Sequence, residues 1–193
     1  MKKIFIIGIL LLTALFTANA QGFYFDIGIG FGGATTKLDG NDVSKLVSNV
    51  TEVGVDFGLK AGYGPILNIP LYVVGTFGGI GHRLAEGSDY LQFNSYMIGA
   101  GLIFYPIPLI QIAGSIGFSY VGNQTSFPMT MYKSKSGFAG DISVAVDLGR
   151  GNHGCLIGLR YFGASNELEI SRVEQSTSYF GVFVRYTYRH KIR

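Results

Sequence analysis

Eight charged side chains sit at positions that alternate with large apolar residues along the chain. They are Asp26, Glu52, Asp56, Lys60, Asp141, Asp147, Arg160 and Arg185. Charges removed from water must be paired or hydrated. If these side chains share an enclosed space, they form either a salt-bridged network that seals it or a narrow polar path whose pairs rearrange. We expect the sealing network and keep the path or gate as the alternative.

Histidine chemistry is a second candidate. His82 is followed by a polar segment that contains Glu86, Ser88 and Asp89, the residue types of acid–base and nucleophilic catalysis. A catalytic set needs mutual hydrogen-bond contact and an orienting partner, whereas residues grouped in one polar loop are usually just solvated. We therefore expect no catalytic residues and no enzyme activity.

Metal, cofactor and nucleic-acid chemistry have little support. Cys155 is the one cysteine, so the chain has neither a disulfide framework nor a thiolate cluster. Gly28, Gly30 and Gly32 alternate within a predicted strand with no helix after it, so they do not form a dinucleotide fingerprint. The net charge of +3 is too small to indicate nucleic acid. We expect no metal and no cofactor.

The composition narrows the fold class. Among 193 residues there are 29 glycines, and aromatic and charged residues each make up 14%. Soluble domains carry roughly 25% charged residues, so this chain has little charge with which to cover a surface in water. Beyond the first twenty residues no apolar segment is long enough for a membrane-spanning helix. A β-protein whose outer face does not meet water fits these facts.

Residues 1–20 have the organisation of a cleaved signal peptide. Two lysines precede the uncharged apolar stretch 4–16, and Ala18 and Ala20 form the small-x-small cleavage site. We therefore divide the chain into a signal peptide, 1–20, and one domain, 21–193.

Alternation of period two recurs along this domain and predicts β-strands. The expected strands cover residues 22–35, 50–62, 71–82, 92–105, 109–122, 136–148, 154–164 and 177–189. Connections after the odd-numbered strands are longer and polar (36–49, 83–91, 123–135 and 165–176), and the others are short. A brief helix is expected within 39–49. Alternating long and short connections are typical of transmembrane β-barrels.

The two faces of these strands indicate which side meets lipid. One face is large and apolar, and the other holds the eight charges and many glycines. An eight-stranded barrel is only just filled by side chains, so the apolar face must point outward, with Tyr24 and Phe183 tucked against glycine inside. Aromatic residues near strand ends would form interfacial girdles. On the short-turn side these are Phe23, Phe104, Tyr105, Tyr186 and Tyr188, and on the long-loop side Phe31, Tyr96, Phe118, Tyr120, Phe138, Tyr161 and Phe180.

The whole domain resembles the small eight-stranded outer-membrane β-barrels of bacteria, the OmpX, OmpA-barrel and OmpW types. Its last strand resembles the C-terminal signal read by the barrel-assembly machinery. The residues of this signal are Tyr179, Gly181, Val184, Tyr186 and Tyr188.

The resemblance implies an all-β, up-and-down transmembrane barrel in the outer membrane, with membrane lipid and the assembly machinery as partners. We expect a non-enzymatic protein with a plugged lumen and a structural or surface-interacting role. Its long loops are the expected contact surface for an extracellular ligand. The alternatives are an OmpW-like channel for small hydrophobic molecules and a lipid-modifying enzyme.

Overall fold

The computed structural model describes residues 22–46, 50–66, 69–126, 134–149, 151–169 and 173–189. The expected signal peptide, with Ala18 and Ala20, lies outside these ranges. Within them, no helix combines the length and the apolar character needed to cross a membrane.

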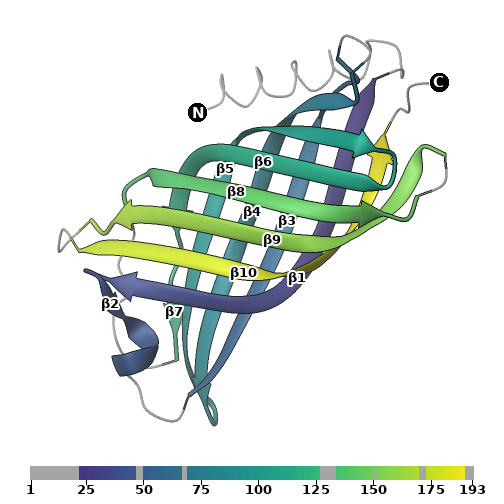
Figure 1. The fold of residues 1–193 in the computed structure, drawn as a ribbon. Helices are drawn as coiled ribbons and strands as arrows, with labels where there is room; N and C mark the ends of the chain where they lie inside the picture. The colour runs from purple at the N-terminus through teal and green to yellow at the C-terminus, as the bar shows by residue number, and fades with distance from the viewer. Residues whose placement is uncertain are drawn as a thin grey trace.

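Long antiparallel strands follow one another around a closed barrel (Figure 1). The eight long strands are β1 (Phe23–Leu38), β3 (Thr51–Tyr63), β4 (Leu71–Glu86), β5 (Asp89–Ile107), β6 (Ile110–Val121), β8 (Gly137–Asp147), β9 (His153–Glu167) and β10 (Glu174–Arg189). The short strands β2 (Asn41–Asp42) and β7 (Gln124–Thr125) and the 3₁₀ helix η1 (Val43–Leu46) lie together at one end.

Pairing of β10 with β1 closes the barrel. The register runs from Tyr24 opposite Arg189 to Leu38 opposite Gln175. Each long strand therefore has two neighbours, and closure pairs backbone groups that an open sheet edge would leave free. We call the end where β1 begins the turn end, and the end where β1 finishes the loop end.

The predicted faces are confirmed. The outer surface exposes large apolar side chains along every long strand, among them Ile29, Ile98, Ile116 and Val182. Charged side chains of the alternate positions, such as Arg160 and Arg185, are almost completely buried inside. A surface with so many contiguous exposed apolar residues is suited to a hydrocarbon environment.

Two expectations about the strands need correction. Residues 83–91 were predicted as a long polar connection, but β4 and β5 pair as far as Glu86 opposite Asp89. Only Gly87 and Ser88 remain as the turn, and Gly87 has the positive φ of +61° that such tight hairpins require. Tyr105 was placed in an outer girdle, but it points into the lumen and is only 2% exposed.

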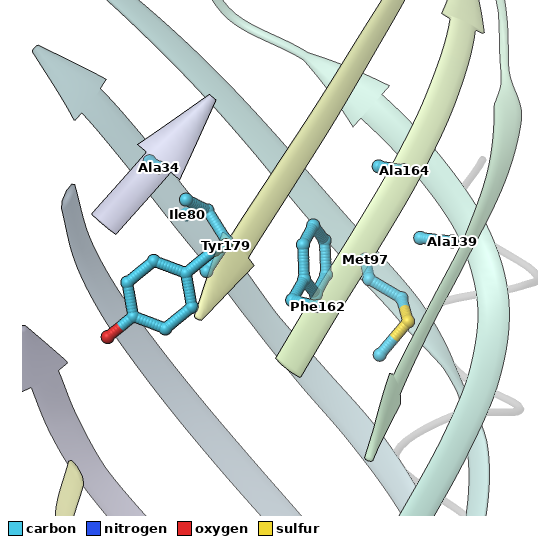
Figure 2. Packing of buried hydrophobic residues seen from close by; sticks show 7 residues of the cluster. All are labelled: Ala34, Ile80, Met97, Ala139, Phe162, Ala164 and Tyr179. Atoms are coloured by element: carbon cyan, nitrogen blue, oxygen red, sulfur yellow. The ribbon is translucent and has the colours of Figure 1, made fainter. Parts of the chain in front are cut away.

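The lumen is filled by side chains in successive layers. A turn-end layer consists of Tyr24, Tyr72, Val74, Ile103, Tyr105 and Ala113. Nearer the loop end lies a mid-barrel layer, shown in Figure 2, of Ala34, Ile80, Met97, Ala139, Phe162, Ala164 and Tyr179. A cap layer of Val43, Leu84 and Phe93, with Leu38, Val50 and Leu91 against it, closes the loop end. Because η1 contributes Val43, the predicted helix within 39–49 is a 3₁₀ turn that completes this cap.

Candidate functional site

Three cations and three carboxylates meet between the turn-end and mid-barrel layers. This charge cluster consists of Asp26, Asp56, Lys60, Asp141, Arg160 and Arg185, which come from β1, β3, β8, β9 and β10. All six side chains are buried. With three charges of each sign the cluster is neutral, as a buried group of charges should be.

Arg160 is the best-connected member of the charge cluster. Its Nη1 donates to Asp56 Oδ2 at 2.6 Å, and its Nε donates to Asp141 Oδ2 at 2.9 Å. Lys60 Nζ lies 3.4 Å from the same Asp141 oxygen and donates to Ser115 Oγ at 3.1 Å. Arg160 therefore ties strands from opposite sides of the barrel into one network.

Arg185 is held more loosely. Its Nη1 lies 3.6 Å from Asp26 Oδ1, and its Nη2 lies 3.6 Å from Asp56 Oδ2. Both distances exceed an ordinary charged hydrogen bond, and Nε and Nη2 have no protein hydrogen-bond partner. Its guanidinium carbon lies 4.4 Å from the centre of the Phe183 ring, a cation–π contact.

Glycines make the space that the arginines occupy. Gly28 and Gly58 are paired across β1 and β3, and Gly28 is opposite Arg185 on β10. A Cβ atom at Gly58 would come within 2.7 Å of Arg185 Nη2. The small residues that alternate with apolar ones in the sequence thus form the wall against which the charge cluster packs.

Two of the eight predicted charges lie outside the charge cluster. Asp147 is buried toward the turn end, where its Oδ2 lies 2.8 Å from Arg189 Nη2. Glu52 lies at the loop end with a half-exposed side chain, and its Oε2 is 4.0 Å from His82 Nε2. The structure thus separates the predicted set into a central cluster and one pair at each end.

Gln111 and Arg189 at the turn end are residues that sequence reasoning missed. Gln111 Nε2 donates to the hydroxyls of Tyr24, at 2.9 Å, and Tyr105, at 2.8 Å. The Tyr24 hydroxyl in turn donates to Asp26 Oδ2 at 2.8 Å, which links this group to the charge cluster. Arg189 stacks on Tyr105 at 4.0 Å. The alternation along the last strand could have indicated that Arg189 points inward, because it follows Arg185 and Thr187 at every second position.

His82 lies beneath the cap layer and away from the polar residues grouped with it above. It is fully buried, and its Nδ1 is 2.9 Å from Thr36 Oγ1. Ser88 is in the hairpin turn, beyond the end of β4. At the cap itself, partial desolvation acts to raise the pKa of Asp42, but hydrogen bonds from Ser44 outweigh it and hold the pKa below its ordinary value.

The arrangement around His82 has the residue types of a hydrolytic triad without its accessibility. Thr36, in the position of a nucleophile, is completely buried, whereas the acid, Glu52, is the exposed member. A nucleophile must be reachable by substrate, so these contacts fix the cap. Within the described ranges, no group of three or more metal-ligating side chains is arranged to hold an ion.

The proposed C-terminal signal residues divide between the two faces of β10. Tyr179 and Gly181 point into the lumen, where Tyr179 joins the mid-barrel layer. Val184 and Tyr186 are exposed on the outer face, and Tyr188 lies on that face beside Phe23 with ring centres 6.2 Å apart.

Comparison with solved structures identifies the architecture. No protein-family model and no curated protein sequence matches the chain. The attachment invasion locus protein Ail of Yersinia pestis, in complex with the heparin analogue sucrose octasulfate, aligns with a TM-score of 0.51 and 18% identity over 86% of this chain and 99% of that chain. The Neisserial surface protein A aligns with a TM-score of 0.53 and 15% identity over 84% and 95% of the two chains.

This chain has the fold of the small outer-membrane β-barrels. In such a barrel the turn end is periplasmic and the loop end is extracellular. The charge cluster of this barrel is enclosed between the turn-end layer and the mid-barrel layer.

Proposed function

We propose that this protein is a non-enzymatic, integral outer-membrane barrel, exported by a signal peptide over 1–20, whose lumen is sealed by side chains and whose loop end makes contacts outside the cell. The observation that carries the proposal is the series of layers in the lumen. The turn-end layer, the charge cluster, the mid-barrel layer and the cap layer follow one another from end to end.

Each layer opposes the passage of a hydrated solute in its own way. The turn-end and mid-barrel layers are built mainly from apolar atoms, and the Tyr24 and Tyr105 hydroxyls already hydrogen-bond to Gln111, so few polar groups are left to replace a hydration shell. Apolar constrictions exclude ions by losing water. The neutral charge cluster bridges the barrel, because Arg160 contacts carboxylates of β3 and β8 at once. A sealed scaffold leaves the loops as the surface on which a function is built.

A rearranging gate has one specific observation in its favour. Arg185 lies at 3.6 Å from two carboxylates, so a small movement would pair it fully with either Asp26 or Asp56. This exchange is the alternative function, in which the lumen becomes a narrow path for small molecules.

Single-channel conductance of the refolded barrel in a planar bilayer separates the two proposals. Heat-modifiable migration on a gel first establishes that the protein is folded. A silent bilayer supports the sealed barrel. Reproducible openings that change in an Arg185→Met variant would overturn it in favour of the gate.

The assignment to the outer membrane and its assembly has its own test. The Val184, Tyr186 and Tyr188 side chains share the outer face of β10, where a C-terminal recognition signal would be read. Replacing Tyr186 and Tyr188 with serine should reduce the amount of folded barrel in outer-membrane fractions while export continues. An unchanged amount would contradict recognition through these residues.

A further inference from the structure

A groove of about 590 Å³ runs across the outer face of the barrel over β8, β9, β10 and β1. Its floor is a row of small outward-facing residues that are paired in register across these strands. The row runs from Gly140 to Gly163, Ser178 and Thr35. Its volume lies within the range of small-molecule binding sites.

Large side chains wall this outer groove. Ile142 and Tyr161 stand on the side nearer the middle of the barrel, and Ile116 and Phe138 close the end over β6 and β8. All four are exposed on the outer face. In a membrane these apolar walls contact hydrocarbon, so the natural occupant of the space between them is an acyl chain rather than water.

The groove becomes more polar toward the loop end. On the side toward the loop end a second row consists of Ser165, Ser176 and Lys37, paired in register across β9, β10 and β1. Phe138, a residue of the predicted loop-end girdle, is paired with Ser165 and is therefore level with this second row, where the lipid headgroups are expected. The groove therefore crosses from the hydrocarbon into the headgroup level, with the same polarity as a lipid.

Lys37 is available to bind an anion there. Carboxylates around it have other partners: Asp42, opposite Lys37, accepts two hydrogen bonds from Ser44, Asp39 accepts one from Glu174 N, and Glu174 accepts one from Ser165 at 2.7 Å. Among the residues that the structure describes, Lys37 makes no ion pair. A lysine ammonium at headgroup level fits a phosphate.

We propose that the outer groove binds one phosphorylated glycolipid of the outer leaflet, with an acyl chain along Gly140 and Gly163 and a phosphate on Lys37. The hydroxyls of Ser165 and Ser176 in the row of Lys37, with those of Thr35 and Ser178 beside them in the floor, favour a sugar-bearing headgroup, because hydroxyl groups both donate and accept hydrogen bonds. The inference rests on the proposed orientation, in which the loop end lies outside the membrane.

The test is native mass spectrometry of the refolded barrel in detergent with added lipid A. A leucine at Gly163 would fill the groove, and it fits because the nearest atom to its Cβ, Tyr161 Oη, is 3.7 Å away. Gly75→Leu is the matched control, since Gly75 is an outward glycine of β4 whose Cβ would also meet nothing closer than 3.8 Å. Both variants must show heat-modifiable migration.

We expect the wild type and Gly75→Leu to retain one lipid A molecule. Retention should fall roughly tenfold in Gly163→Leu, and it should also fall in Lys37→Gln.

Equal retention by all four proteins, or none by the wild type, overturns the site. Retention of phosphatidylglycerol in place of lipid A overturns the assignment to a glycolipid, and a protein dimer lost in Gly163→Leu would assign the groove to a second copy. A folded, non-conducting barrel that retains no lipid contradicts this inference alone and leaves the sealed lumen standing.

Discussion

Arg160 and Arg185 belong to one charge cluster but differ in how tightly they are held, and this difference predicts unequal effects. Arg160→Met leaves two buried carboxylates without their shortest contacts and should lower the free energy of unfolding by about 3–5 kcal/mol. Arg185→Met loses ion-pair contacts of 3.6 Å and the cation–π contact with Phe183, so we expect a loss of about 1–3 kcal/mol. Urea unfolding in lipid vesicles measures both, with the exposed Lys45→Met as the control. Equal losses would mean that Arg185 is paired as closely as Arg160.

Residue types and their alternation along each strand indicated which charged side chains face inward, but not which of them would contact one another. Six of the eight predicted charges form the central cluster, because their positions along neighbouring strands bring them to one level. Glu52 and Asp147 share the same inward face but lie toward opposite ends of the barrel. The level of a residue depends on strand register and tilt, and alternation within one strand contains no information about either.

At the scale of the strand, β1 contains two kinds of glycine with opposite predicted behaviour. A Cβ at inward-facing Gly28 would overlap the Val184 carbonyl oxygen and come within 2.5 Å of Arg185 Cγ, whereas Gly33 faces open space. Gly28→Ala should therefore destabilise the barrel by about 1–3 kcal/mol, as overpacking does. Gly33→Ala should be neutral or slightly stabilising, because alanine suits a strand better. Thermal gel-shift midpoints compare the two, and a similar drop for both would show that strand glycines matter for reasons other than space.

Period two predicts the long strands, least clearly over residues 71–82, where both faces are apolar. It does not predict how far five of them extend at the loop end, namely β1, β4, β5, β9 and β10. β4 and β5 continue to Glu86 and Asp89 because a tight turn at Gly87 lets backbone pairing extend past the apolar alternation. The polar residues there resembled a loop by composition. Backbone pairing is indifferent to side-chain polarity, so composition marks where the apolar band ends rather than where the strand ends.

At the scale of the molecule, the apolar outer face and the filled lumen have one cause: the lumen holds too few side chains for the many large apolar residues to face inward. The lumen of an eight-stranded barrel has room for a limited set of residues, and here glycines admit a few large ones. The inward tyrosines were harder to predict, since Tyr72 and Tyr105 have the size and polarity of girdle residues. Their alternate positions along β4 and β5 place both inside, and Gln111 donates a hydrogen bond to the Tyr105 hydroxyl there.

The layers act in series, and this predicts that no single truncation opens the barrel. Phe162→Ala weakens the mid-barrel layer but leaves the charge cluster and the turn-end tyrosines in place. Tyr105→Ala weakens the turn-end layer and leaves Arg160 bridging two carboxylates. Each variant should be less stable, by about 3–5 kcal/mol for the phenylalanine, yet remain silent in single-channel recordings once folding is verified by gel shift. Because barriers in series each suffice to stop an ion, openings in either variant would show that the truncated layer alone seals a lumen that is otherwise hydrated.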